Sequence, residues 1–315
     1  MKAAVIENFD RPPTYRDFAD PEPTGREELV EVVASGLHQI VRGQSSGQHY
    51  SSHRQLPMIP GVDGIARRSD GSLAYFGGLR APYGTFAERA AAAMLIPLPD
   101  DLDPAVAAAS MNPGMSGWNA LALRAELQPG QSVVVLGATG ASGQAAVQAA
   151  KLLGAADVIA VGRSAEALRS VAQTADHTVR IDVGADWQTQ VAALADSVDV
   201  VVDYLWGDPA AGLLGALVTG RADSTRQLTW VQVGSMAGSP LSLDSELLRS
   251  CNLRLIGSGL GSLPMDRIAT QLPIFVEHLA AGRLQVTPAR RRLADITDAW
   301  SEQVPSGQRL VLLPD

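Results

Sequence analysis

From about residue 104 onward, short apolar runs alternate with segments of helical character. The apolar runs have the length and β-branched composition of buried strands, and strands are expected at 132–136, 157–161, 178–181, 198–203, 228–233 and 253–257. Helices are expected at 104–110, 116–126, 142–153, 165–173, 187–195, 208–218 and 265–281. Strands that alternate with helices predict an α/β fold with a doubly wound parallel sheet.

The first hundred or so residues have a different pattern, with short strands and many turns. Strands are expected at 2–6, 29–35 and 93–98, separated by turns that carry Pro and Gly. Residues 43–54 are polar and rich in Ser and Gly, so we expect a loop there, of the kind that often lies near substrate. The chain therefore divides into a β-rich part and an α/β part.

Length, charge and cysteine content exclude several classes of protein. The 315 residues favour two domains, and a net charge of −8 without a basic run argues against nucleic-acid binding. Cys251 is the only cysteine, which excludes an intramolecular disulfide and thiolate-rich zinc sites. The N-terminus has no apolar signal core, and no apolar run reaches the roughly 20 residues of a membrane helix. We expect a soluble cytoplasmic protein.

The most specific motif is a strand, a glycine-rich turn, a helix and a second strand over 133–163. Gly140 and Gly143 occupy the second and third glycine positions of the dinucleotide fingerprint, with Ala138 at the first. Such a turn lets the backbone approach a pyrophosphate, which then binds the N–H groups and the positive end of the helix. The expected contact residues are Ala138, Thr139, Gly140, Ala141, Ser142 and Gly143. The alternative is a tight turn without a ligand.

The second strand of this motif ends in Gly162, Arg163 and Ser164, where an acidic residue would bind a free ribose 2′-hydroxyl. A guanidinium at this position instead fits a 2′-phosphate, and the Ser164 hydroxyl can add a donor. The sequence therefore predicts NADPH rather than NADH as the cofactor. The alternative is a solvated surface arginine.

Further motifs extend along almost the whole chain: MKAAV at the start, Ala34-Ser35-Gly36, Leu56-Pro57, Pro60-Gly61-Val62-Asp63-Gly64, Gly84-Thr85-Phe86-Ala87-Glu88, Val233-Gly234-Ser235 and Gly307-Gln308-Arg309-Leu310-Val311-Leu312. In this order and spacing they resemble the medium-chain dehydrogenase/reductase superfamily, specifically its zinc-free, zeta-crystallin-like quinone oxidoreductase branch. The resemblance implies a GroES-like β-barrel catalytic domain over 1–114, completed by 261–315. It also implies a Rossmann domain over 115–260 and a homodimer, with strand 253–257 as a candidate for joining two sheets and a mixed interface of helices as the equal alternative.

Zinc-dependent members of the family hold catalytic metal at three positions that correspond here to His38, Val62 and Asn112. Valine cannot bind a metal and asparagine is a poor zinc ligand, so we expect no metal. Without a Lewis acid, simple alcohol oxidation is not expected. Zinc-free relatives use NADPH to reduce quinones or conjugated C=C bonds, which implies a quinone or an α,β-unsaturated carbonyl compound as the small-molecule substrate.

Such a reduction needs a group that stabilises negative charge on oxygen and a proton source. Tyr50, His38 and Asn112 are the candidates, because the resemblance implies active-site positions for them. A loop tyrosine on the surface and a histidine that only holds its loop are the alternatives. We expect Asp63 to stabilise its turn rather than act as a base.

The resemblance implies further cofactor contacts, which are Ser116, Val233, Gly234, Ser235, Gly257, Ser258 and Gly259 at the nicotinamide end and Arg309 as a supplement to the 2′-phosphate site. Two other functions stay open. One is reduction of an enoyl thioester on an acyl carrier. The other is a crystallin- or sensor-like protein that binds NADPH with little catalysis, since no acid–base pair stands out in the sequence.

Overall fold

The computed structural model describes all residues except 54, 183, 185, 195–197, 260 and 315, and the chain forms two compact units. Unit 1 comprises Met1–Asn112 and His278–Asp315, and unit 2 comprises Pro113–Glu277. The boundaries fall within α2 (Pro104–Asn119) and α8 (Met265–Ala280).

The second boundary differs from the expected one at 260/261, because most of α8 packs with unit 2. The Trp118 indole N–H donates to Oε1 of Gln271 at 3.0 Å, and its ring meets Phe275 edge-on at 6.0 Å between centroids. Trp118 is almost fully buried in this contact. The glycine- and serine-bearing segment around 257–262 precedes α8 and has the composition of a domain linker.

Unit 2 is built on a six-stranded sheet with the strand order β10-β9-β8-β11-β12-β13. The strands are β8 (Ser132–Leu136), β9 (Asp157–Gly162), β10 (His177–Arg180), β11 (Val200–Asp203), β12 (Leu228–Gln232) and β13 (Leu253–Gly257). All neighbours pair in parallel, and the order reverses between β8 and β11. Ligands of such sheets bind at this reversal, outside the carboxyl ends of the strands.

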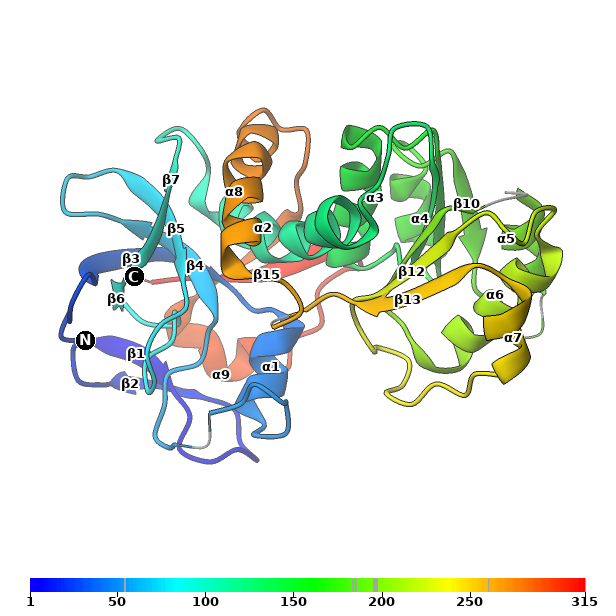
Figure 1. The fold of residues 1–315 in the computed structure, drawn as a ribbon. Helices are drawn as coiled ribbons and strands as arrows, with labels where there is room; N and C mark the ends of the chain where they lie inside the picture. Colours follow the sequence, from blue (N-terminus) through cyan, green and yellow to red (C-terminus); the bar gives the residue numbers. More distant parts are fainter. Residues whose placement is uncertain (54, 183, 185, 195–197, 260, 315) are drawn as a thin grey trace. The chain divides into compact units, whose positions relative to one another are not determined.

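Helices cover both faces of this sheet, as Figure 1 shows with α3 and α4 on one side and α6 and α7 on the other. The helices are α3 (Ala141–Leu152), α4 (Ala165–Val171), α5 (Trp187–Leu194), α6 (Gly207–Gly220) and α7 (Ser245–Ser250). Val134 and Val201 of the sheet are fully buried against residues of α5 and α6 such as Val191 and Leu213. Burial of the strands on both faces explains their uninterrupted apolar runs.

Unit 1 contains a seven-stranded mixed sheet with the order β14-β15-β3-β4-β5-β7, in which β6 also pairs with β3. Its strands are β3 (Glu28–Gly36), β4 (Asp63–Arg67), β5 (Leu73–Gly77), β6 (Arg89–Ala92), β7 (Met94–Leu98), β14 (Thr287–Arg292) and β15 (Gln308–Leu313); β1 (Lys2–Val5) and β2 (Thr14–Asp17) form a separate pair. Because β15 pairs with β3, both ends of the chain contribute to one sheet. The predicted fold class, a doubly wound parallel sheet with a second β-rich unit, is confirmed.

Two helical segments differ from the sequence expectation. The first part of the expected loop 43–54 belongs to α1 (Gln39–Ser45), which buries Val41 and Ser45 one turn apart. The expected helices 104–110 and 116–126 are one helix, α2, followed by a π-helical turn, η1 (Ala120–Ala125). Pro113 lies inside α2 without ending it, which a sequence pattern does not foresee because an internal proline usually breaks a helix.

Short helical turns η2 (Leu293–Asp295) and α9 (Ile296–Ala299) complete unit 1. Among the described residues, no helix has both the length and the apolar character needed to cross a bilayer.

Candidate functional site

The glycine turn of unit 2 connects β8 to α3 at the point where the strand order reverses. Gly137 has a φ of +95°, in the region that favours glycine. A Cβ on Gly143 would lie 2.2 Å from the carbonyl oxygen of Gly137, so the close packing of helix and turn requires glycine there. A Cβ on Gly140 would meet nothing closer than 3.8 Å. The backbone at Gly140 therefore faces open space that a ligand can occupy.

The start of α3 offers backbone donors at this turn. Gly140 is the N-cap and provides no side-chain cap, so the N–H groups of Ala141, Ser142 and Gly143 have no intrahelical partner. Such donors and the positive helix end bind anions such as a pyrophosphate. Ala138 is buried and its N–H donates to the carbonyl of Val161. This N–H is therefore not free to bind a ligand, and Ala138 only helps to shape the turn.

The end of β9 meets the same turn. A Cβ on Gly162 would lie 2.4 Å from Cγ2 of Thr139, which places the Thr139 side chain against this strand end. Arg163 follows and is exposed, with no ion pair to any residue within the described ranges. The Ser164 hydroxyl accepts the N–H of Ala167 at 3.2 Å and caps α4. The guanidinium is thus available to an anion next to the glycine turn.

Asp203, at the carboxyl end of β11, fixes the loop that follows this strand and contacts the neighbouring strand β12. Its buried carboxylate accepts the backbone N–H groups of Leu205 at 2.8 Å and Trp206 at 2.9 Å, and the indole N–H of Trp230 at 3.1 Å. Burial raises the pKa of Asp203, and these three hydrogen bonds oppose the rise. The sequence gives no sign of this role, because the partners come from a loop and from the neighbouring strand.

Only some of the groups expected at the nicotinamide end are free to bind a ligand. The N–H groups of Val233 and Gly234 both donate to the backbone carbonyl of Asp203, at 2.7 and 3.1 Å. These two donors are therefore engaged within the protein, and the Ser235 side chain remains for a ligand. The carbonyl of Gly257 accepts the guanidinium N–H of Arg124 at 2.7 Å, and the N–H of Ser258 donates to the carbonyl of Gln232 at 2.8 Å.

Gly259 is held in the same segment, because its N–H donates to the Ser262 hydroxyl at 2.8 Å. Arg124 also donates to the carbonyl of Ser262 at 3.3 Å. Arg124 was missed by the sequence analysis, since nothing in an alanine-rich helix indicates that its arginine fixes a distant loop.

Ser116 lies beside a tyrosine that the sequence analysis also missed. The Ser116 hydroxyl donates to the carbonyl of Pro113 at 2.7 Å, and its oxygen lies 3.3 Å from the Tyr204 hydroxyl. Burial raises the pKa of Tyr204, so the phenol is neutral and can donate. A Cβ on Gly117 would lie 2.7 Å from the Cβ of Ala146 and 3.0 Å from the same hydroxyl, so close packing against both explains the glycine there.

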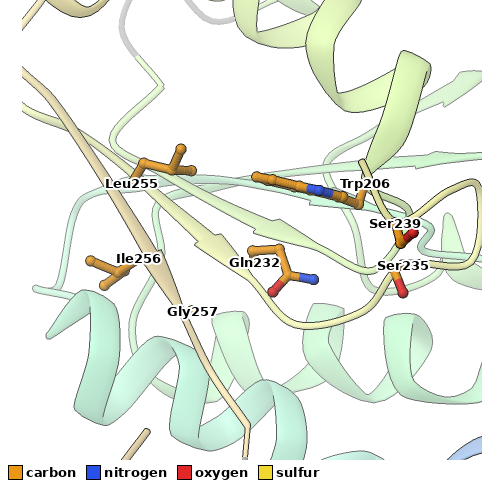
Figure 2. Close-up of a pocket in the computed structure, with 7 residues that line it drawn as sticks. All are labelled: Trp206, Gln232, Ser235, Ser239, Leu255, Ile256 and Gly257. Carbon is orange, nitrogen blue, oxygen red and sulfur yellow. The ribbon is translucent and has the colours of Figure 1, made fainter. Parts of the chain in front are cut away.

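A hollow of about 370 Å³ opens at the ends of β12 and β13. Figure 2 shows the residues that line it, which are Trp206, Gln232, Ser235, Ser239, Leu255, Ile256 and Gly257. Trp206 has a φ of +57°, a conformation that is uncommon for a bulky side chain. The Asp203 carboxylate holds the Trp206 N–H in this conformation, so backbone strain is concentrated at the rim of the hollow.

In unit 1, several polar side chains surround Asp63. His38 is the N-cap of α1 and is buried, with Nε2 at 3.3 Å from Oδ1 of Asp63. The Asn112 amide donates to the same oxygen at 3.4 Å. Tyr75 is also near Asp63, and burial followed by this nearby charge raises the pKa of Tyr75. The expectation that Asp63 stabilises its turn is wrong, since the carboxylate points to other elements.

Burial makes His38 neutral. Desolvation lowers the pKa of His38, and the Asp63 carboxylate only partly opposes this shift. Neither ring nitrogen has a well-aligned hydrogen bond within the described part of the chain. A Cβ on Gly36 would lie 2.4 Å from the His38 ring, so glycine at this position makes room for the imidazole.

Arg309 lies in unit 1 next to this cluster. Its Nη1 donates to the carbonyl of Leu37 at 3.4 Å, and its Nε is buried without a hydrogen bond among the described residues. Burial, together with the neighbouring charge of Arg42, lowers the pKa of Arg309 to about 10.

Tyr50 lies in the loop that follows α1. It is 75% exposed, and its ring packs on His49 at 4.2 Å between centroids. Of the three catalytic candidates, the structure brings His38 and Asn112 together through Asp63 and leaves Tyr50 at the surface. Within the described ranges, no group of three or more His, Cys, Asp or Glu side chains is arranged to hold a metal.

Comparisons with known proteins agree with this architecture. A family model described as a zinc-binding dehydrogenase matches residues 141–276, which lie in unit 2 and exclude His38, Val62 and Asn112. A protein of Emericella nidulans described as the probable NADPH-dependent quinone reductase tdiC is 30% identical, with 100% of both chains covered. The crystal structure of a quinone oxidoreductase from Thermus thermophilus is 26% identical, covers 99% of this chain and 100% of its own, and has a TM-score of 0.83.

A third relative is much longer than this chain. A component protein of the phenolphthiocerol/phthiocerol polyketide synthase of Mycobacterium tuberculosis is 26% identical over 95% of this chain, which spans 14% of that protein.

The parallel sheet and its glycine turn are those of oxidoreductases that use a dinucleotide. The chain belongs to the medium-chain dehydrogenase/reductase superfamily, as a quinone oxidoreductase-like member.

Proposed function

We propose that this protein is an NADPH-dependent reductase that transfers hydride to a quinone or an α,β-unsaturated carbonyl compound and needs no zinc. The observation that carries the proposal is Arg163, an exposed guanidinium that directly follows β9 and has no ion pair to a described residue. A cation at this point of a dinucleotide fold fits a ribose 2′-phosphate. The match to a probable NADPH-dependent quinone reductase supports the same cofactor and acceptor class.

The residues of unit 2 fit a dinucleotide. The pyrophosphate would bind the N–H groups at the start of α3, against the open backbone of Gly140. The 2′-phosphate would bind Arg163 and Ser164 of unit 2, whereas Arg309 belongs to unit 1 and is not assigned to this phosphate. The nicotinamide end would contact Ser116 and the segments 233–235 and 257–259. When bound, NADPH supplies the hydride.

Unit 1 provides the groups that we assign to the acceptor. A neutral His38 with no well-aligned hydrogen bond, and the Asn112 amide beside it, are suited to hold a carbonyl oxygen that gains negative charge. Asp63 positions both groups, because it contacts each of them. Tyr50 is the candidate proton donor from the loop, since an exposed phenol can exchange its proton with water.

Two features of the donor set support zinc independence. Val62 offers no ligand atom at the second of the three metal positions, and the Asp63 oxygen that faces His38 already accepts the Asn112 amide. We expect full activity from protein treated with a chelator and no stoichiometric zinc by elemental analysis. Zinc bound at one ion per chain, with activity lost on its removal, would contradict this part of the proposal.

The cofactor assignment is tested by removing one charge. We expect Arg163→Gln to weaken NADPH binding by roughly 10- to 100-fold, the range of a charge-assisted contact, and to leave NADH binding unchanged. Arg169→Gln, on the exposed side of α4, removes the same charge nearby and serves as the matched control. Binding is measured by quenching of tryptophan fluorescence. A wild-type preference for NADH would refute the assignment.

The acceptor class is tested by NADPH oxidation across quinones, alkenals and enoyl thioesters. The match to a polyketide synthase favours enoyl thioesters as the second candidate, because polyketide chains are carried as thioesters. Turnover confined to thioesters would select that function. Tight NADPH binding without turnover of any acceptor would select a protein that only binds the cofactor.

We also propose a homodimer joined at β13. This strand is an edge of the parallel sheet, and Leu255 on it is 36% exposed. An open edge strand with apolar side chains readily pairs with another chain.

A further inference from the structure

Unit 1 contains two half-buried arginines near His38, Arg42 and Arg309, which form no ion pair with an acid among the described residues. Arg42 lies on α1, one turn after His38, and its Nε is buried without a hydrogen bond among the described residues. No ion pair joins Arg42 to an acid within the described ranges. Burial alone shifts the pKa of Arg42, downward, and no acid offsets the shift.

Arg309 is the second member of this pair. Its backbone adjoins the start of α1, since Leu37 donates its N–H to Leu310 and accepts from the Arg309 guanidinium. Its Nε also lacks a hydrogen bond among the described residues. The charges of Arg42 and Asp63 both act on Arg309, which shows that the two guanidinium groups share one electrostatic environment.

The charges of this cluster do not balance. Arg42 and Arg309 are positive, Asp63 is negative and already shared by His38, Asn112 and Tyr75, and His38 is neutral. One positive charge therefore remains without a counter-charge in a half-buried cluster, in which the Nε atoms of both arginines are buried. Burial of an unpaired charge is costly, so proteins keep such groups where a ligand completes the pair.

We propose that Arg42 and Arg309 bind a carboxylate on the acceptor molecule, so that the substrates of this protein are acidic quinones or enones. The inference rests on the proposed function and narrows its substrate class. A carboxylate carries the single negative charge that the cluster lacks, and its two oxygens match the planar fork of a guanidinium. The adjacent His38 can then meet the carbonyl oxygen of the same molecule.

The test compares an acid with its neutral ester. Benzoylacrylic acid and its methyl ester share one enone but differ in charge and in how strongly the carboxyl group activates the double bond, so the readout is the change of their ratio between wild type and variant. We expect Arg42→Gln to lower the acid-to-ester ratio of kcat/KM by roughly 10-fold or more relative to wild type, as expected for loss of a charge-assisted contact. Arg26→Gln removes an exposed arginine of the same unit and should leave the ratio at its wild-type value.

A second variant covers the case in which replacing Arg309, whose Nε is buried, by glutamine prevents folding. Arg309→Lys keeps the charge but loses the fork, and we expect it to lower the ratio while far-ultraviolet circular dichroism stays native. Binding of benzoate and benzamide, measured by calorimetry, gives a readout without turnover. Benzoate should bind more tightly than benzamide, and the difference should shrink in Arg42→Gln.

The outcomes separate the two possible sources of the anion. If Arg42→Gln weakens NADPH binding and leaves the acid-to-ester ratio unchanged, the arginines bind phosphate of the cofactor and the inference is overturned. Equal ratios in wild type and variant, with no change in cofactor binding, also overturn it. If benzoate binds through Arg42 but no acceptor is reduced, the proposed function fails and the carboxylate site stands.

Discussion

Gly140 and Gly143 lie in the same turn but have different surroundings. The Gly143 position is closed by the backbone of Gly137, whereas the Gly140 position is open. The φ of Gly140 is −76°, which any residue can adopt. Glycine is therefore required for folding at position 143, whereas at position 140 it keeps space for a ligand.

We expect Gly140→Ala to keep the stability of the wild type but to weaken NADPH binding by about 10-fold or more, because a methyl group would occupy the space of the pyrophosphate. Gly143→Ala should lower the unfolding midpoint as well, because its methyl group would overlap a backbone carbonyl. Thermal melts and fluorescence titrations measure the two effects. Unchanged NADPH binding in Gly140→Ala would favour a turn that holds no ligand.

His38 allows a prediction about pH. Its pKa is lowered in the folded protein, so the unfolded chain binds a proton at a higher pH than the folded chain does. Stability should therefore fall as the pH drops below about 6.5, the ordinary pKa of histidine. We expect His38→Asn to flatten the dependence of the melting temperature on pH in this range.

The matched control for this prediction is His53→Asn, because His53 is exposed. It should retain the wild-type slope of melting temperature against pH. An identical slope in wild type and His38→Asn would show that other groups cause the acid sensitivity.

At the residue scale, the sequence predicts functional residues when they lie close along the chain to the elements that position them. Arg163 and the turn glycines are close in sequence to the strand and helix that position them, so spacing alone identifies them as candidates. The partners of Asp63 come from α1, β5 and α2, and those of Asp203 from the next loop and β12. No spacing rule links such residues, and their roles emerge only with the tertiary structure.

At the element scale, apolar periodicity predicts the strands of unit 2 closely, because their runs are long and buried on both faces. It fails for α1, where Val41 is the one buried apolar residue in a polar segment. It also fails for α2, because tertiary packing tolerates Pro113 and prolongs the helix into η1. Both failures lie next to candidate site residues, His38 in one case and Ser116 in the other.

At the scale of the whole molecule, alternating strands and helices predict a doubly wound sheet but do not by themselves specify its edges. The strand order shows that β10 and β13 are the edges of the described sheet. β13 carries Leu255 at its surface, and the strand adjoins the hollow rimmed by Trp206. A second chain paired along β13 would cover apolar surface and add residues near this hollow.

The dimer is tested by placing a charge on this edge. We expect wild-type protein to sediment as a dimer and Leu255→Lys to shift it toward the monomer, because like charges would face each other across a two-fold interface, at a cost of several kcal/mol. Leu29→Lys is the control, since Leu29 is 42% exposed and belongs to unit 1, which does not contain the parallel sheet. A monomeric wild type, or a Leu255→Lys protein as dimeric as the control, would show that β13 does not join two chains. If the variant is monomeric and its KM for the acceptor also rises, the hollow beside β13 would need the second chain for its shape.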